Sequence, residues 1–297
     1  MSRMALRIAS RSSALALWQA NTVGAMLGCE YEIIEVATTG DTHTEMSISE
    51  LGSIGAFAKE IQIAVLNGEA DIAVHSAKDL PSQTPEGLEL VCVPLRGDVR
   101  DVLIGSMLDD LPYGAVVGTG AQRRRAQLAA LRPDLQFKEL RGNIDTRLDK
   151  ASDFDAIVLS AAALQRLGRE ARITEILPLH VMLPQVGQGA LAVETRSDDE
   201  AMKELLSAIN NSDAYRCVIA ERSFLETLGG GCSIPCGAFA TPIDSKIVWL
   251  RALLSEPRGR QIARVEQQGD DPVALGRDVA REILDNKGGA EIMEMVS

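Results

Sequence analysis

Short apolar runs that indicate strands alternate with helix-like segments along the first two thirds of this chain. The first strands are expected at residues 5–9, 31–37 and 72–74. Ser12 or Ser13 can cap the helix that Gly28 ends, and a second helix over 57–66 stops at Asn67-Gly68. This order predicts an open doubly wound α/β sheet, whose functional residues lie beyond the carboxyl ends of its strands.

The same alternation restarts after a polar stretch at residues 96–101. Its strands are expected at 102–105, 116–118, 137–140 and 156–159, and its helices at 121–131, 144–150 and 161–167. From near Asp213 the pattern changes to a helix over 214–228, strands near 238–241, 247–253 and 260–267, and a helix over 272–285. Because 297 residues exceed one ordinary core, we predict two similar α/β lobes, 1–95 and 96–189, and a small α+β domain over 210–297.

Charge is distributed unevenly along the chain. The formal net charge is −12, yet residues 121–172 hold eleven Lys and Arg against seven Asp and Glu. An acidic protein with a confined basic segment is unsuited to coating nucleic acid, but it suits a small polyanionic ligand held in a pocket. The alternative is a solvated helical face.

Membrane and disulfide signals are both weak. No apolar run approaches the ~20 residues of a membrane span or the length of a signal peptide core, so we expect a cytoplasmic protein without a membrane partner. Five scattered cysteines favour free thiols. Cys232 and Cys236 lack a second Cys pair and the chain holds three histidines, so no metal site is assigned.

Glycines and arginines gather where strands of the second lobe end. Gly118-Thr119-Gly120 precedes a helix whose first turn carries Arg123 and Arg124, an arrangement that favours anions through backbone N–H groups, the helix dipole and guanidinium forks. Three more arginines follow strands of the same lobe: Arg141, Arg147 and Arg166. The alternative is that these arginines pair on the surface with Asp145, Asp149, Asp153 and Asp155.

Three side chains stand out as candidates for chemistry. Asp79 follows Lys78 in a strand-end loop, where a carboxylate could stabilise a cationic nitrogen and move a proton, or could simply form a turn. Cys232 follows three glycines, so a bulky partner can reach its thiol, although many lone thiols are idle. His75 ends an apolar strand and is more typical of a structural histidine than of a base. Trp18 and Phe57 are expected in cores, with Phe57 the better candidate for a pocket.

Read together, several segments resemble the hydroxymethylbilane synthase (porphobilinogen deaminase) family. The match runs in order along nearly the whole chain, through Arg11-Ser12-Ser13, Leu17-Trp18-Gln19, Asp71–Pro81, Val117–Thr119, Arg123-Arg124, Leu140–Asn143, Thr146-Arg147, Val186–Ala190 and Glu226–Pro235. The most specific segments are His75–Pro81 and Gly229–Pro235.

The resemblance implies two periplasmic-binding-protein-like lobes, with residues 190–209 returning to the first lobe. It also implies the stepwise condensation of four porphobilinogen molecules with loss of ammonia, followed by hydrolysis to linear hydroxymethylbilane in tetrapyrrole biosynthesis. A dipyrromethane cofactor, bound through a thioether to Cys232, carries the growing chain. Porphobilinogen is then the partner, and the enzyme is expected to be a monomer.

The resemblance also assigns roles to individual residues. Asp79 is the catalytic residue, near both pyrrole nitrogens when an electrophilic azafulvene forms and is attacked. The cations expected to hold acetate and propionate groups are Arg11, Arg123, Arg124, Arg141, Arg147 and Arg166. Further cofactor and substrate contacts are expected from Ser13, Gln19, Lys78, Thr119 and Gln188, and the pocket is expected to include Phe57, His75 and Ser76.

The chain also departs from the family pattern. Glu50 and Ile54 stand in a loop where many members carry basic residues, and Gly120-Ala121 stands where a Ser-Ser pair is common. Two other functions compete. A ligand sensor or solute-binding module would use the same two-lobed fold, and a redox or acyl-transfer enzyme would use Cys232 with Cys236 or His75.

Overall fold

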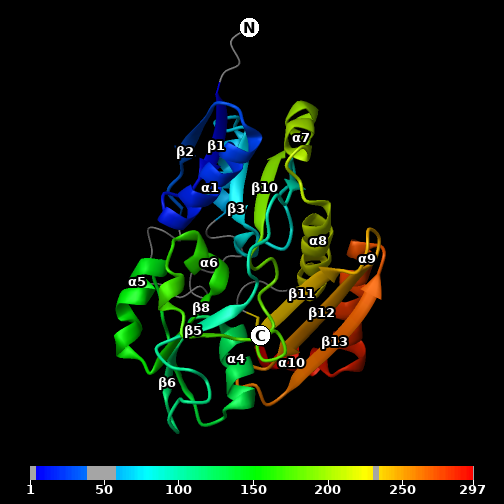
Figure 1. Ribbon diagram of the computed structural model, residues 1–297. Helices are drawn as coiled ribbons and strands as arrows, with labels where there is room; N and C mark the ends of the chain where they lie inside the picture. The colour runs from blue at the N-terminus through cyan, green and yellow to red at the C-terminus, as the bar shows by residue number, and fades with distance from the viewer. Residues whose placement is uncertain (1–4, 39–57, 230–233, 297) are drawn as a thin grey trace.

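The structure is a computed structural model that describes residues 5–38, 58–229 and 234–296. Its first five-stranded sheet, at the top of Figure 1, has the order β2-β1-β3-β10-β4. These strands are β1 (Leu6–Ser10), β2 (Tyr31–Glu35), β3 (Ile72–Ser76), β4 (Leu88–Cys92) and β10 (Leu191–Arg196). The second sheet has the order β7-β6-β8-β5-β9. Its strands are β5 (Asp101–Ile104), β6 (Val116–Gly118), β7 (Gln136–Lys138), β8 (Ala156–Ser160) and β9 (Glu175–Ile176).

Helices accompany both sheets, as the sequence predicts. The first sheet has α1 (Ala14–Leu27), α3 (Lys59–Leu66) and α7 (Glu200–Ser207), and the second has α4 (Gln122–Leu131), α5 (Ile144–Asp149) and α6 (Ala161–Arg166). The Ser13 side chain accepts a hydrogen bond from the Ala16 backbone N–H, and Gly28 ends α1 at φ 66°. Both caps confirm the predicted ends of that helix. The helix α7 was not predicted.

Each five-stranded sheet contains one antiparallel strand that the chain forms directly after crossing over from the other sheet. After β4 the chain crosses to the second sheet, where β5 pairs antiparallel with β8 and β9; after β9 it returns, and β10 pairs antiparallel with β3 and β4. The return agrees with the resemblance. The predicted α/β class is confirmed, but each sheet is mixed rather than wholly parallel. The two crossovers meet in an antiparallel bridge between Arg96 and Ala190.

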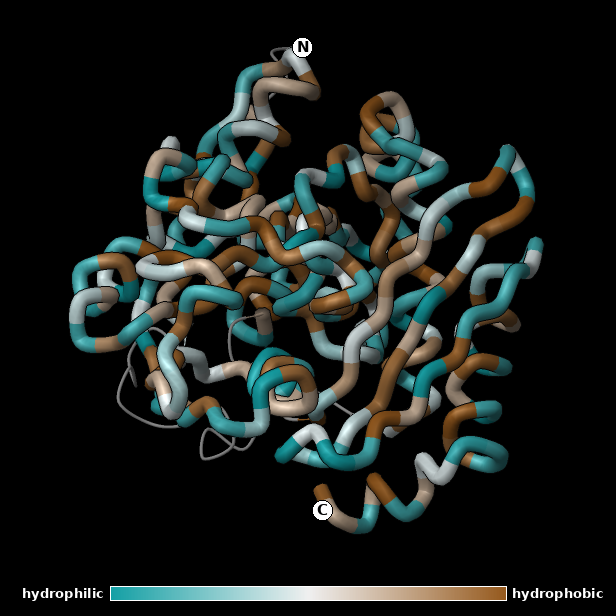
Figure 2. The backbone as a smooth tube through the Cα atoms, turned by 60° about the horizontal axis from the view of Figure 1, so that its bottom comes forward, coloured by the Kyte–Doolittle hydropathy of each residue, from teal (hydrophilic) through white to brown (hydrophobic). Residues whose placement is uncertain are grey.

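The C-terminal unit is a three-stranded antiparallel sheet covered by helices. Its elements are α8 (Ser212–Thr227), β11 (Cys236–Pro242), β12 (Val248–Ser255), β13 (Ile262–Gly269), α9 (Pro272–Arg281) and α10 (Gly289–Val296). Hydrophobic and hydrophilic residues both occur along these strands (Figure 2), and alternate positions face a core with α8 and α9 that includes Phe224, Leu250 and Val279. This confirms the predicted α+β architecture. The predicted last helix is shorter, because α9 passes into a π-helical turn at 282–286.

One buried carboxylate joins the C-terminal unit to both crossovers. Glu221 of α8 is fully buried and forms a bidentate ion pair with Arg96, at 2.8 and 3.0 Å. It also accepts backbone hydrogen bonds from Gly187 in the second crossover and from Ala240 in β11, both at 2.8 Å. Four charge-assisted bonds at one side chain fix the three units at a common junction.

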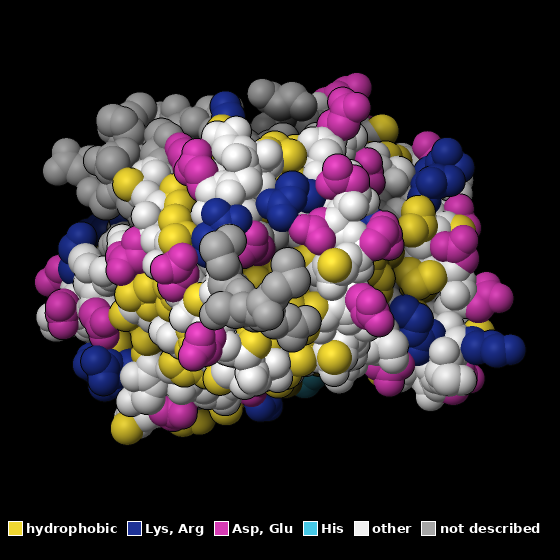
Figure 3. Space-filling model, turned by 90° about the horizontal axis from the view of Figure 1, so that it is seen from above, with side chains coloured by type: hydrophobic (Ala, Val, Ile, Leu, Met, Phe, Trp, Pro, Cys, Tyr) yellow, Lys and Arg dark blue, Asp and Glu magenta, His cyan; other side chains and the backbone are white. Residues whose placement is uncertain are grey.

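The outer surface is mixed in character. On the face seen in Figure 3, acidic and basic side chains lie interspersed among apolar ones. Within the described ranges, no helix combines the length and the apolar character that crossing a membrane requires.

Candidate active site

A narrow cleft lies where the ends of β3 and β8 approach the second crossover. The residues that line it come from α1, the end of β3, the start of α6 and the crossover: Leu15, Ser76, Lys78, Ser160, Ala162, Ala163, Arg166, Gly189 and Ala190. Four predicted site features therefore meet here, namely the β3 end, Lys78, Arg166 and the glycine-containing segment near 188. Its walls come from both sheets, as expected for a site between two lobes.

The first wall is a tight turn at the end of β3. Residues Ala77–Asp79 form a single 3₁₀ turn. Gly187 lies directly behind it at φ 71°, and a Cβ there would come within 2.9 Å of the Ala77 carbonyl carbon. Only glycine therefore allows this approach. Burial lowers the pKa of Lys78 to about 8, while the charge of Asp79 acts in the opposite direction. The turn thus presents a cation and a carboxylate side by side.

Two buried polar pairs fix the strand that leads into this turn. The Gln19 amide of α1 donates to the Ser76 hydroxyl at 2.7 Å. One residue earlier, His75 Nε2 lies 3.2 Å from Glu194 Oε2 on β10, and Gln62 donates to the same oxygen at 2.9 Å. Burial would raise the pKa of Glu194, but the nearby His75 ring and the hydrogen bonds from Gln62 hold it below the ordinary value. These contacts support the structural interpretation of His75.

Asp101, which is fully buried at the start of β5, pairs in register with the cleft residue Ser160 of β8. Arg123 Nη1 lies 2.8 Å from one carboxylate oxygen, and Arg124 donates to the other from Nε and Nη2 at 3.1 and 2.8 Å. Gln188 donates to that second oxygen at 2.9 Å. Burial would raise the pKa of Asp101, yet the two arginines outweigh it and keep this pKa well below its usual range. We call these four residues the Asp101 cluster.

Two more arginines follow the end of β7. Arg141 forms an ion pair with Glu139 at 2.7 Å, and Arg147 donates to the Gly142 carbonyl at 2.7 Å. Burial lowers the pKa of Arg147 to about 10, with a further contribution from Arg124, whereas Asp79 acts to raise it. The charges of Arg147 and Asp79 therefore influence each other, although α5 accompanies the second sheet and the 3₁₀ turn follows β3 of the first.

Arg166 bridges the cleft from α6. It donates to the Gly189 carbonyl at 2.6 Å, and its guanidinium lies 5.5 Å from the centre of the Trp18 ring. Burial lowers its pKa to about 10. Trp18 is only half-buried, so the expectation of a core tryptophan is wrong: its ring faces a cation of the other wall.

The remaining candidates have local roles or lie outside the described residues. Thr119 is buried, and its hydroxyl accepts from the Ala121 N–H at 3.2 Å, so part of the predicted backbone anion site is already satisfied. Arg11 is half-buried after β1. The positions outside the described ranges are Cys232, Phe57, Glu50 and Ile54.

The alternative, that these arginines pair on the surface with Asp145, Asp149, Asp153 and Asp155, is wrong for them. Their partners are Asp101, Glu139 and backbone carbonyls, while Asp145 pairs with Arg169. Burial raises the pKa values of Cys92 and Cys217 to about 12, so neither thiol is a nucleophile at neutral pH.

Sequence reasoning missed the three buried acids Asp101, Glu194 and Glu221. A signal was present for Glu194, a charged residue inside an otherwise apolar strand, where it requires a partner, whereas Asp101 ends a polar stretch and gives no such signal. The partners were not identifiable because they lie far away in the sequence.

Comparisons with known proteins identify the family of the chain. Residues 6–204 match the family described as porphobilinogen deaminase, dipyrromethane cofactor binding domain, and residues 215–285 match the porphobilinogen deaminase C-terminal domain. A curated porphobilinogen deaminase from Brevibacillus brevis is 42% identical over 300 residues, covering 98% of this chain and 97% of the relative.

Solved structures give weaker similarities. YhfZ from Shigella flexneri aligns with a TM-score of 0.38 at 17% identity, over 77% of this chain and 99% of that one. A Salmonella typhimurium periplasmic binding protein with high arginine specificity also scores 0.38, at 13% identity over 69% and 91%. Scores this low carry no argument. The sequence matches do identify the family, because they span both parts of the molecule in order. The chain belongs to the porphobilinogen deaminase family.

Proposed function

We propose that the cleft condenses four porphobilinogen molecules head to tail, releasing four ammonia molecules, and that one water molecule then releases linear hydroxymethylbilane. The observation that carries this proposal is that Ser76 and Lys78 of one sheet line the same cleft as Ser160 and Arg166 of the other, in a member of the porphobilinogen deaminase family. A single carboxylate beside several cations suits a substrate that carries two carboxylates and develops one positive charge during reaction.

The Asp101 cluster fits a dipyrromethane group. Arg123 Nη2 and Gln188 Oε1 are buried, and neither finds a hydrogen-bond partner within the described residues. One is a donor suited to a carboxylate, and the other is an acceptor suited to a pyrrole N–H. The group would supply the pyrrole ring that is extended, and Arg123, Arg124 and Gln188 would hold it. Its thioether attachment to Cys232 remains our proposal from the family resemblance.

Asp79 is the proposed catalytic residue. As ammonia leaves porphobilinogen, positive charge develops on the substrate's pyrrole nitrogen, and a fixed carboxylate stabilises that charge. The same carboxylate can accept the proton that the ring loses after the new carbon–carbon bond has formed. Gly187 and the 3₁₀ turn hold Asp79 in place, so little reorganisation is needed when the charge appears.

The arginines bind and orient the acidic side chains of substrate and product. Arg141, Arg147 and Arg166 are half-buried and Arg166 lines the cleft, whereas Arg123 and Arg124 are more deeply buried around Asp101. Partial desolvation strengthens each interaction with a carboxylate. Arg11, Ser13, Gln19 and Thr119 are proposed as further contacts.

We also propose that the protein acts as a cytoplasmic monomer, without a nucleic-acid or membrane partner. The formal charge of −12 and the interspersed surface charges support this proposal. The residue boundaries 1–95 with 190–209, 96–189 and 210–297 likewise remain predictions for independently folding parts.

Turnover tests the proposed reaction. Purified protein is incubated with porphobilinogen, and ammonia and linear tetrapyrrole are quantified together. The proposal expects four ammonia molecules for each tetrapyrrole, and it expects Asp79→Asn to abolish most of both signals. Substrate that remains unconsumed by a folded, cofactor-loaded protein would refute the assignment and favour a binding module.

A further inference from the structure

The helix α8 packs against two parts of the molecule at once. Phe224 on one side belongs to the core of the C-terminal sheet. On another side, Val218 shares a buried apolar cluster with Ala77 and Leu80, at the 3₁₀ turn that follows β3. In the sequence, α8 leads directly into the segment that contains Cys232. One helix therefore contacts the turn that carries the proposed catalytic carboxylate and precedes the proposed cofactor cysteine.

The segment that follows the turn, residues 81–84, is held by α8. It has no regular secondary structure, and among the described residues no backbone–backbone hydrogen bond involves it. Arg222 of α8 instead donates from Nη2 to the Ser82 carbonyl at 3.2 Å and to the Thr84 hydroxyl at 3.4 Å. We call residues 81–84 the post-turn segment. Its position depends on α8 because no strand ladder fixes it.

The burial of Arg222 indicates that position is its main contribution. Its side chain is 7% exposed, and burial lowers its pKa, while the charges of Glu194 and Glu226 act in the opposite direction. The oxygens to which it donates are uncharged. A buried cation that binds neutral oxygens adds little to stability. Glu226 in turn accepts from the exposed Gln83 amide at 3.2 Å, a second contact between α8 and the post-turn segment.

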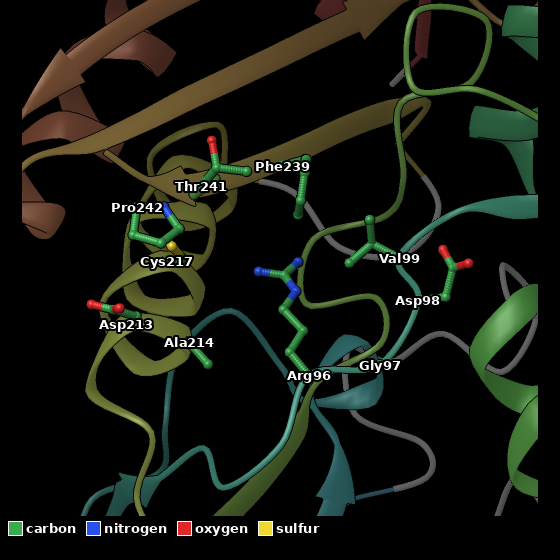
Figure 4. A pocket seen from close by; sticks show the side chains of 11 residues that line it. Arg96, Gly97, Asp98, Val99, Asp213, Ala214, Cys217, Phe239, Thr241 and Pro242 are labelled. Atoms are coloured by element: carbon green, nitrogen blue, oxygen red, sulfur yellow. The ribbon is translucent and has the colours of Figure 1, made fainter. Parts of the chain in front are cut away.

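The neighbouring residue of α8 holds the turn from its other side. Glu221 accepts from the Gly187 N–H at 2.8 Å, and Gly187 lies directly behind the turn. In the same crossover, the Gln185 amide donates to the Lys78 carbonyl at 3.3 Å. Figure 4 shows the first crossover beside α8, with Arg96, the ion-pair partner of Glu221, pointing toward the helix. Adjacent side chains of α8 thus hold the segments on both sides of the turn.

We infer that Arg222 is a positioning residue for Asp79. By holding the Ser82 carbonyl and the Thr84 hydroxyl against α8, it fixes the Asp79 carboxylate relative to the unit that contains Cys232. The inference rests on the proposed catalytic role of Asp79, through which Arg222 acts. Loss of Arg222 lets the turn move while the arginines that bind carboxylates stay in place. A displacement of about 1 Å at a reacting group costs on the order of 10²-fold in rate.

Kinetics of the cofactor-loaded protein in two backgrounds test this inference. Arg222→Met should lower kcat by about 10–100-fold with little change in KM, but it should cause no further fall when Asp79 is already Asn. Arg216→Met is the matched control, because Arg216 lies on the same helix and pairs with Asp213 instead, and it should leave kcat unchanged. An equal fall in both backgrounds, or no fall in either, overturns the positioning role.

Amide hydrogen exchange reports on the turn without depending on activity. In a peptide covering residues 77–84, the bonded N–H groups are those of Ala77 and Leu80. Arg222→Met should speed their exchange, and Arg222→Lys should restore much of the protection, because its ammonium can still donate to a carbonyl. Unchanged exchange in folded Arg222→Met overturns the inference.

A second variant covers the case in which Arg222→Met does not fold by circular dichroism. Thr84→Val combined with Gln83→Ala removes two side-chain contacts to α8 from the post-turn segment, and it should give faster exchange with a several-fold fall in kcat. Wild-type exchange and kcat in that variant refute the inference. Wild-type kcat in Asp79→Asn would refute the proposed function itself, whereas a normal loss there with equal effects of Arg222→Met in both backgrounds refutes the positioning role alone.

Discussion

The two five-stranded sheets share one topology but differ in the chemistry at their strand ends. In both, the fourth strand in the order runs antiparallel and carries a buried acid: Glu194 on β10 and Asp101 on β5. Glu194 faces a histidine and an amide, whereas Asp101 faces two arginines and an amide. The same architecture thus supports a carboxylate–lysine turn in one half and a cationic wall in the other. Fold fixes where the groups lie, and the residues decide what they do.

If proton chemistry belongs to the first sheet, Asp79→Asn has the largest effect on activity. We expect kcat to fall by about 10²–10⁴-fold, because the neutral amide neither stabilises the cationic nitrogen nor accepts a proton. KM changes little, since the arginines are intact. Steady-state kinetics with porphobilinogen measure both, and Asp110→Asn on the exposed surface is the matched control. A kcat of Asp79→Asn equal to that of wild type would show that Asp79 is not the catalytic carboxylate.

The buried acids provide the next test. Asp101→Asn leaves two buried guanidinium groups without their counter-ion and costs about 3–5 kcal/mol in the free energy of unfolding. Glu194→Gln costs about 1–3 kcal/mol, because its partners are a histidine and an amide and not two guanidinium groups. Urea denaturation of both variants measures the difference. A larger loss of unfolding free energy in Glu194→Gln than in Asp101→Asn would contradict our comparison of the two sheets.

Lys78 makes the first sheet sensitive to alkaline pH. Burial lowers its pKa from 10.5 to about 8, so between these values the unfolded chain binds more protons than the folded one. The cost of burying a charged lysine is fully present below about pH 8 and is relieved as the pH rises towards 10.5. Relative to Lys78→Met, wild type should gain about 1–2 kcal/mol between pH 7 and 10, since partial exposure screens part of the effect. A difference that stays constant with pH would show that Lys78 is not desolvated.

Arg147 tests the cationic wall. Arg147→Gln should raise KM by about tenfold with a smaller change in kcat, because one carboxylate contact is lost. Added salt should weaken substrate binding less in this variant than in wild type. Arg277→Gln on the exposed face of α9 is the control and should leave both constants unchanged. An equal fall in kcat and kcat/KM would instead place Arg147 in contact with the transition state alone.

Local patterns in the sequence predicted the parts of the fold that local interactions determine. Ser13 and Gly28 bound α1 because a hydroxyl cap and a left-handed glycine act within a few residues. The β3 end and the arginine-bearing strand ends were found for the same reason. The Asp101 cluster was not predicted, because Gln188 lies 87 residues from Asp101 in the sequence. The contact between Glu194 and Gln62 was missed for the same reason, since 132 residues separate them. Arg123 was predicted as a ligand contact, and its additional hydrogen bond to the Leu183 carbonyl is visible only in three dimensions.

The mass of the intact protein tests the central claim most directly, namely that the cleft works on a group tethered to Cys232. Wild type and Cys232→Ala are purified in parallel, supplied with porphobilinogen and measured by mass spectrometry under denaturing conditions. Our account predicts an adduct equal to two condensed porphobilinogen units on wild type alone. An unmodified wild type that remains active, or the same adduct on Cys232→Ala, would contradict it.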